Sequence, residues 1–199
     1  MKTNNQTLMK KLLFTLIVIC FTFSGFTQTQ NHLTFKGIPI EGSMTSFCQK
    51  LKAKGFTEID SDNNITLFSG DFTGQNAMVG VTSSNNGQNV FGVTVIFESS
   101  EEWKTLVNTY DYYKDLYTRK YGTPSISKEK NPTNLDANIY KMHELTSGTV
   151  VWGSKWEVEG GTIEISIEKS DNYGDGMVVI LYRDSQNVEA KIQSDLEDI

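Results

Sequence analysis

Two different spacings of apolar residues alternate along the chain. The first helical spacing begins at Ser43, whose hydroxyl suits the N-cap because it can accept a hydrogen bond from the first turn. The apolar stripe of this helix consists of Met44, Phe47, Cys48 and Leu51. Lysines near its end and Gly55 just beyond favour termination there. The pattern predicts a short amphipathic helix with Cys48 in its buried face, preceded by a short strand from His32 to Ile40.

From Phe56 to Glu98 the apolar residues alternate with polar or small ones, which is the period of a half-buried strand. The alternating apolar positions are Ile65, Leu67, Ala77, Val79, Val81, Phe91, Val93, Val95 and Phe97. Turn-forming sequences separate the alternating segments, among them Asn86-Gly87. Because no helical segment intervenes, the pattern predicts an antiparallel meander of about four strands.

A second, longer helix is predicted from about Ser100 to Tyr121. Ser99 and Glu102 have the spacing of a capping box, and Gly122 with the following proline favours termination. The apolar stripe of this helix is rich in aromatic residues and consists of Trp103, Leu106, Val107, Tyr110, Tyr113, Tyr117 and Tyr121. At helical spacing we expect these rings to pack in the core, with the tyrosine hydroxyls at its edge.

Strand patterns return in the last third of the chain. Trp152 and Trp156 fall on one face of a predicted strand, and Lys155 and Glu157 fall on the other. In the next strand the apolar face is formed by Ile163, Ile165 and Ile167, and the polar face by Glu164, Ser166 and Glu168. The segment Met177 to Tyr182 is apolar on both faces, as expected for a central strand. The residues from Ser185 to Ile199 predict a short acidic helix at the end of the chain.

The order of these elements predicts the fold class. Each half of the chain reads as a helix followed by strands, with halves spanning residues 33–98 and 99–183 and an acidic tail at 184–199. We therefore expect an α+β fold: an antiparallel sheet of about eight strands with two helices packed on one face, built as a tandem helix-plus-four-strand duplication.

The first 27 residues have the organisation of a secretory signal peptide. Three lysines precede a run of about a dozen uncharged residues, which is shorter than the roughly 20 that a membrane-spanning helix needs. We expect cleavage near Thr27, which leaves residues 28–199 as a single exported α+β domain, periplasmic or extracellular. Lipidation of Cys20 is disfavoured because that site requires a small residue before the cysteine, where Ile19 stands.

The composition of the predicted mature chain excludes several classes of function. The whole chain carries a net charge of −6, and removing the three lysines of the export segment leaves 15 basic against 24 acidic residues. An exported acidic chain is a poor candidate for nucleic-acid binding. Cys48 has no second cysteine with which to form an intramolecular disulfide after cleavage.

Several segments resemble a known group of proteins. These are FKGIPIEG (35–42), LKAKGF (51–56), WKTL (103–106) and YGTP (121–124), and together with the export segment they resemble small exported proteins of unknown function from Bacteroidota. The tandem plan of helix and four strands is also similar in topology to the β-lactamase-inhibitor protein and to small lipoproteins of outer-membrane assembly. The first resemblance covers nearly all of the mature chain and implies export. Neither implies a reaction, because fold does not determine function.

The sequence offers little material for catalysis. A nucleophilic Cys48 would need His32 or His143 as its base, yet we expect Cys48 to be buried. No spacing of His and Cys typical of a metal site is present, and the acidic segment 60–64 lacks the glycine and glutamate of a calcium loop. We therefore expect no metal, no cofactor and no enzymatic activity.

The predicted outer face of the sheet is the remaining candidate for function. We expect this polar surface to bind a protein or peptide of the cell envelope through Lys155, Glu157, Glu164, Ser166 and Glu168. Two alternatives to this binding function stay open. The first is a structural or assembly protein of the envelope, and the second is a glycan hydrolase that uses a pair of these carboxylates.

Overall fold

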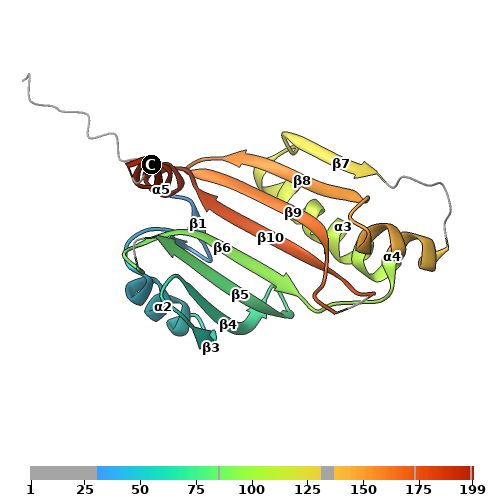
Figure 1. Cartoon of the computed structure of the whole chain (residues 1–199), viewed down its shortest axis with the longest axis horizontal. Helices are drawn as coiled ribbons and strands as arrows, with labels where there is room; N and C mark the ends of the chain where they lie inside the picture. Colours follow the sequence, from blue (N-terminus) through green and yellow to red (C-terminus); the bar gives the residue numbers. More distant parts are fainter. Residues whose placement is uncertain (1–30, 85, 131–136, 173, 198) are drawn as a thin grey trace, which may run out of the picture. The chain divides into compact units, whose positions relative to one another are not determined.

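Within the described residues, eight antiparallel strands form one sheet in the order β3-β4-β5-β6-β10-β9-β8-β7 (Figure 1). The computed structural model describes residues 31–84, 86–130, 137–172, 174–197 and 199, all within the unit Asn31–Ile199. The export segment, with Cys20 and Thr27, lies outside the described residues. The strands are β3 (Thr57–Ser61), β4 (Ile65–Phe72), β5 (Gln75–Ser84), β6 (Asn89–Phe97), β7 (Ile126–Lys130), β8 (Val151–Val158), β9 (Gly161–Lys169) and β10 (Gly176–Asp184).

The helices of the described residues are α2 (Met44–Ala53), α3 (Trp103–Tyr121), α4 (Asn138–Thr146) and α5 (Ser185–Glu197). The predicted α+β fold with a large antiparallel sheet is thus confirmed. Each half consists of a helix followed by four strands, and the last strands of the two halves, β6 and β10, pair at the centre of the sheet. The short helix α4 interrupts the second half between β7 and β8. Among the described residues, the helices fall short of the length and apolar character that a bilayer-spanning segment requires.

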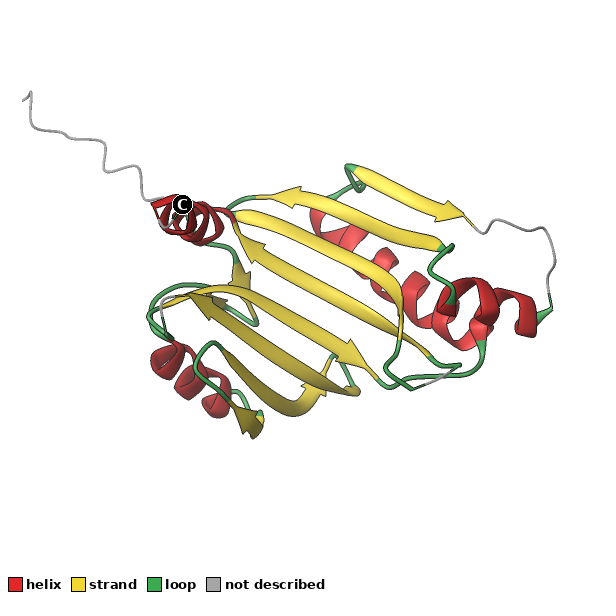
Figure 2. Cartoon of the chain, in the orientation of Figure 1, coloured by secondary structure: helices red, strands yellow, loops and turns green. Residues whose placement is uncertain are grey.

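One face of the sheet forms the core. Strand pairing places a single row of side chains across it, consisting of Phe68, Val79, Val95, Ile180, Ile165 and Ser154. All of these are buried, and the five apolar ones belong with the apolar stripes of α2 and α3 to one hydrophobic cluster. Figure 2 shows α3 behind the strands, so the opposite face is turned toward the viewer. We call that face the open face.

The first predicted helix agrees with α2 in its cap, its stripe and its end. The Ser43 hydroxyl accepts a hydrogen bond from Ser46 N, and Gly55 follows the C-cap with a φ of 92°. Cys48 is only 6% exposed, and burial raises the pKa of its thiol, although a hydrogen bond with Thr66 opposes this effect. The thiol is therefore held in its unreactive protonated form.

This burial predicts a low reactivity of Cys48. In a Cys20→Ser background we expect the folded protein to react with Ellman's reagent at pH 8 at least about 100-fold more slowly than the urea-unfolded protein. A matched control carries Cys48→Ala and Gln49→Cys, because Gln49 is exposed on the same helix. The control thiol should react rapidly without urea. Equal rates for Cys48 in the folded and unfolded protein would contradict this prediction.

The predicted capping box of the second helix is wrong. Glu102 is the N-cap of α3 but makes no side-chain capping bond, and the Ser99 hydroxyl instead donates to Asp175 Oδ2 at 3.1 Å. The first turn is capped from elsewhere in the chain, since Asn138 Oδ1 accepts a hydrogen bond of 2.7 Å from Trp103 N. The local spacing missed this cap because the partner lies 35 residues away.

The remaining differences concern the buried face of β4 and several short elements. In β4, Thr66 and Phe68 face the core instead of the predicted Ile65 and Leu67. The predicted leading strand is instead a hairpin of β1 (Thr34–Phe35) and β2 (Ile38–Pro39), because a two-residue turn reverses the chain between them. The sequence pattern missed β7 and α4. The first is exposed at every residue and therefore has no alternation of burial, and the second has only nine residues. The predicted terminal helix corresponds to α5.

Candidate functional site: the open face of the sheet

The five residues predicted to bind a partner all project from the open face or its margin. Trp152, Ser154 and Trp156 of β8 pack toward the helices. Because successive side chains of a strand point to opposite faces, Lys155 and Glu157 point to the open face. In the same way Glu164, Ser166 and Glu168 alternate with the buried isoleucines of β9. The strand pairing aligns Lys155 with Glu164, and Glu157 with Thr162.

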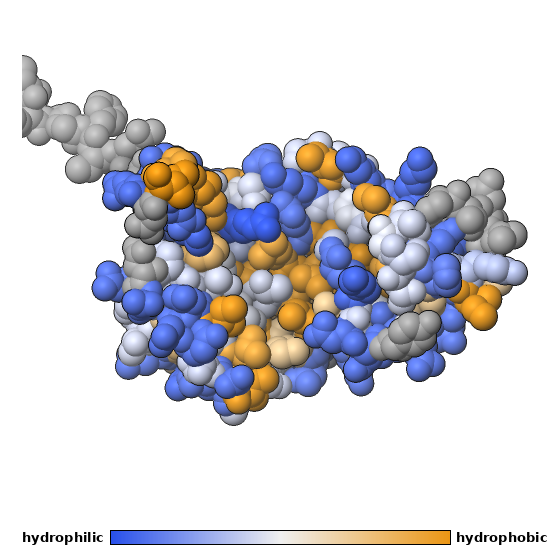
Figure 3. All heavy atoms as spheres, viewed as in Figure 1, coloured by the Kyte–Doolittle hydropathy of each residue, from blue (hydrophilic) through white to orange (hydrophobic). Residues whose placement is uncertain are grey.

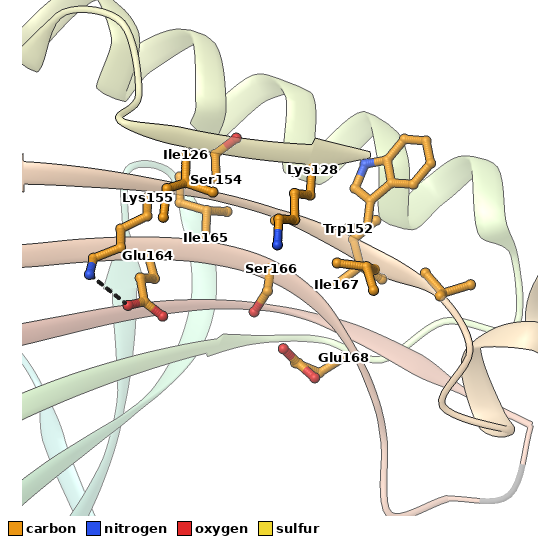
Figure 4. A pocket seen from close by; sticks show the side chains of 13 residues that line it. Ile126, Lys128, Trp152, Ser154, Lys155, Glu164, Ile165, Ser166, Ile167 and Glu168 are labelled. Atoms are coloured by element: carbon orange, nitrogen blue, oxygen red, sulfur yellow. Dashed lines mark ion pairs between the residues drawn. The ribbon is translucent and has the colours of Figure 1, made fainter. Parts of the chain in front are cut away.

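A groove of about 380 Å³ runs over β7, β8 and β9 on this face (Figure 4). Its floor is low where Gly153 and Ser166 are paired, because neither has a side chain larger than a hydroxymethyl group. Lys128 is paired with Gly153 from the other side, and Figure 4 shows its ammonium group directed over the groove. Four of the five predicted residues line the groove, namely Lys155, Glu164, Ser166 and Glu168.

The charges at one end of the groove neutralise one another. Lys155 Nζ lies 2.9 Å from Glu157 Oε1 and 3.9 Å from Glu164 Oε1. Arg183 of β10 adds a second cation, 3.6 Å from Glu164 Oε1. These side chains are partly exposed, so the pairs contribute little to stability, and they can exchange partners at low cost.

The middle of the open face is apolar, whereas the outer face of the sheet was expected to be polar. Apolar side chains of the neighbouring strands β4, β5, β6 and β10 lie next to one another on this face. They form the apolar strip, which consists of Leu67, Met78, Ile96, Val179 and Leu181. All five are half-buried or exposed, with Met78 at 37%. Figure 3 shows apolar atoms at the surface over the middle of this face, with hydrophilic residues around them. The apolar strip adjoins the groove, since Val179 is paired with Ser166.

A signal for this strip was present in the chain. The run from Val95 to Phe97 and the run from Met177 to Tyr182 carry apolar residues at successive positions, so apolar side chains had to lie on both faces of these strands. The strand order then brings the two runs together at the centre of the sheet. Gly153, Lys128 and Arg183 were also missed, because their places at the groove depend on the pairing of strands.

The two edges of the sheet are less suited to binding than its face. Edge strands β3 and β7 have only five residues each, and every one of them is exposed. The sequence of β7 carries charges at Lys128, Glu129 and Lys130, and β3 has a register shift between Glu58 and Asp60. Short, charged and bulged edges are the usual protection against pairing with another strand.

The edge strand β7 is held in place from the helix side. Lys114 Nζ and the Tyr110 hydroxyl, both of α3, donate hydrogen bonds to Glu129 Oε1, and Ser154 Oγ lies 2.7 Å from the Tyr110 oxygen. Burial by itself raises the pKa of Glu129, but the hydrogen bonds from Lys114 and Tyr110 outweigh it and the net pKa is lowered. The wall of the groove formed by β7 is thus anchored through an ionised carboxylate.

The open face has few of the arrangements that catalysis needs. Glu164 and Glu168 are four residues apart on one strand, so their Cα atoms are separated by about 13 Å, and their carboxylates come near each other only if both side chains lean along the strand. Glu164 is moreover paired with Lys155 and Arg183. Among the described residues, no group of three or more His, Cys, Asp or Glu side chains is placed to hold a metal ion. In the acidic segment 60–64, the first two residues end β3 and residues 62–64 form the turn to β4. In this turn Asp62 Oδ1 accepts hydrogen bonds from Asn64 N and Ile65 N, both of 2.8 Å.

Comparison of the chain with protein-family models, with curated proteins and with solved structures gave no match.

Proposed function

We propose that the protein is a non-enzymatic binding module that docks a protein or peptide on the open face of its sheet. The observation that carries the proposal is the apolar strip at the surface of the central strands, bordered by the charged groove over β7 to β9. A large apolar patch with a polar rim is the usual composition of a protein-binding surface. Because the edge strands are short, charged or bulged, a partner is expected to dock on the face of the sheet and not to add a strand at its edge.

The chemistry of the partner follows from this surface. The apolar strip would contact an apolar patch or segment, and Lys155, Glu164 and Arg183 would exchange their mutual ion pairs for pairs with the partner. Glu168 and Lys128 add one charge of each sign at the groove. A surface of this breadth suits a protein or an extended peptide better than an enclosed small molecule.

The predicted export segment supports a function in the cell envelope. We propose that cleavage near Thr27 releases the domain to the periplasm or the exterior, and that the partner is an envelope protein. The alternative of an envelope assembly protein would be favoured if mass spectrometry of the native amino terminus found a lipid on Cys20. The alternative of a glycan hydrolase would be favoured by a glycan-cleaving activity that is lost in Glu157→Gln.

The proposal predicts that binding depends on the apolar strip. Envelope extract is passed over the immobilised protein and over three variants, and the retained proteins are quantified by mass spectrometry. We expect the same specific partner to be retained at least about tenfold less by Met78→Glu and by the double variant Glu164→Lys with Glu168→Lys. Ile139→Glu is the matched control, because Ile139 is 74% exposed on α4 and lies outside the open face.

A second measurement locates the contact. Carbene labelling of the complex should protect Met78 and Lys155 and leave Tyr112, which is 46% exposed on α3, labelled as in the free protein. Retention that is equal for the wild type and both open-face variants would contradict the proposal, as would protection confined to the helices.

A further inference from the structure

A second cavity, of about 340 Å³, lies on the helix side between the β1–β2 hairpin and α3. Its walls are largely aromatic and include Tyr113, Tyr117 and Tyr121 of α3 with Tyr182 of β10. It shares no lining residue with the groove on the open face. The volume falls within the range of sites for small molecules, and such sites are typically lined by apolar and aromatic groups with a few polar ones.

Hydrogen bonds among the tyrosines hold these walls in place. The hydroxyls of Tyr117 and Tyr182 are bonded to each other, and the Tyr113 hydroxyl donates to Phe72 O at 3.2 Å. The rings of Tyr117 and Tyr121 are 5.8 Å apart with an angle of 31° between their planes. Burial raises the pKa of Tyr113 and of Tyr117, so these hydroxyls remain neutral at physiological pH. The cavity is therefore preformed, which reduces the entropy lost when a ligand binds.

The charged residues that line the cavity are positive, although the whole chain carries a net charge of −6 and, after burial, the nearby Asp71 carboxylate contributes to raising the pKa of Tyr113. Among the described residues that line it, Lys36 and Lys120 are the charged ones, and none is a carboxylate. Within the part of the chain that the structure describes, neither ammonium group forms an ion pair with a carboxylate. Lys36 Nζ donates to the backbone oxygen of Asp71 at 3.0 Å, and the Asp71 carboxylate is engaged with Gly74 N. Lys120 Nζ lies 4.7 Å from the centre of the Tyr121 ring.

Two turns at this cavity contain residues that are unusual for their conformation. Lys36 and Thr73 have φ values of 48° and 54°, each is followed by glycine, and each pair forms the two-residue turn of a hairpin. Asparagine is the residue that such positions prefer, and Asn86 occupies the equivalent conformation in the β5–β6 connection. A lysine and a β-branched threonine are strained there, and both line the cavity. Strain retained in this way is typical of functional sites.

We propose that this cavity binds a small aromatic carboxylate. The ring would lie against Tyr117 and Tyr121, and the carboxylate would be held by the ammonium groups of Lys36 and Lys120. A monoanion fits better than a phosphate group, because the lining has no arginine and lies beside the C-terminal half of α3, where the helix dipole is negative. This inference is independent of the open face, since the two sites share no residue.

Calorimetric titration of the purified protein with 2-naphthoate tests the proposal, and 2-naphthamide serves as the neutral probe of the same shape. We expect 2-naphthoate to bind with one site per chain, and 2-naphthamide to bind at least about tenfold more weakly. The absence of binding at millimolar 2-naphthoate would overturn the proposal. Equal affinity for the two probes would overturn it as well, because the lysines would then contribute nothing.

Two lysine variants locate the site. Lys36→Asn and Lys120→Gln should each raise the dissociation constant of 2-naphthoate about tenfold and leave that of 2-naphthamide nearly unchanged. Lys104→Gln is the control, because Lys104 is an exposed lysine of α3 that does not line the cavity. Lys36→Asn should not lower the urea midpoint of unfolding, since asparagine adopts a positive φ more readily than lysine. Binding that is unchanged in both lysine variants would show that the ligand occupies another place and would overturn the proposal.

Discussion

Gly161→Ala is expected to lower the free energy of unfolding by more than about 3 kcal/mol, the largest effect we predict for a single methyl group. Gly161 begins β9 and is paired with Asp184 at the end of β10. A Cβ atom there would lie 2.1 Å from Arg183 O and 3.2 Å from Asp184 Cα. Both are backbone atoms of a central strand, so relief of the clash requires β9 and β10 to separate.

Urea unfolding followed by circular dichroism measures this loss. Gly80→Ala is the matched control, because Gly80 also lies within a strand but its added Cβ would meet only the end of the Leu67 side chain, at 3.4 Å. We expect the control to change stability by less than about 1 kcal/mol. If Gly161→Ala fails to fold, its absence from the soluble fraction, with Gly80→Ala still soluble, shows equally that Gly161→Ala is the more destabilising variant. A Gly161→Ala protein as stable as the control would refute the steric argument.

Asp184→Ala is expected to lower the free energy of unfolding by about 3 kcal/mol. Asp184 is completely buried at the junction of β10 and α5. Its Oδ1 accepts a hydrogen bond of 3.0 Å from Asn187 N in the first turn of α5, and its Oδ2 accepts one of 2.8 Å from Leu33 N. Alanine would leave two backbone donors without an acceptor in a buried place and would remove the cap of α5.

His32 completes this junction. Its Nδ1 lies 3.1 Å from Asp184 Oδ2, within ion-pair distance but without the alignment of a hydrogen bond, and its Nε2 lies 3.4 Å from Glu41 Oε2. The carboxylate thus ties the amino-terminal segment to α5. We expect Asp184→Ala to expose both segments to limited proteolysis before the sheet unfolds.

Two comparisons test the role of Asp184. Asp184→Asn keeps one acceptor oxygen and should lose less stability than Asp184→Ala, since only one of the two backbone donors is then left unpaired. Asp171→Ala, at an exposed turn, should change stability by less than about 0.5 kcal/mol. Equal unfolding midpoints for Asp184→Ala and Asp171→Ala would contradict the prediction.

The parts of the candidate site that could be predicted from the sequence are those that depend on alternation within one strand. Glu164 and Ser166 face away from the core because Ile163 and Ile165 face it, and this follows from the period of a strand alone. The joining of apolar residues from several strands into one strip, and the floor of the groove, could not be predicted in this way. They arise where side chains of different strands are paired, as Val179 is with Ser166 and Gly153 is with Ser166.

The cavity between the β1–β2 hairpin and α3 likewise combines features that the sequence predicts with features that depend on the tertiary structure. The tyrosine stripe of α3 is evident in the sequence, and the prediction that it packs against the core is confirmed by the burial of Tyr110, Tyr113 and Tyr117. The place of Lys36 beside these rings depends on the β1–β2 hairpin, which is separated from α3 by the whole first meander. Nothing in the local pattern around Lys36 indicates an aromatic neighbour.

The sequence by itself determined the long helices, most strands and their order, because helix and strand periods are local properties of the chain. It also determined the buried side of most of these elements, but not of β4, where Phe68 faces the core and Leu67 lies on the open face. The capping of α3 by Asn138, the anchoring of the amino-terminal segment by Asp184 and the two recessed sites were decided only by the tertiary structure. Those contacts join residues 35 to 151 positions apart. Which of many possible long-range pairs forms is a property of strand order and register, and these depend on the free energy of the whole packed fold.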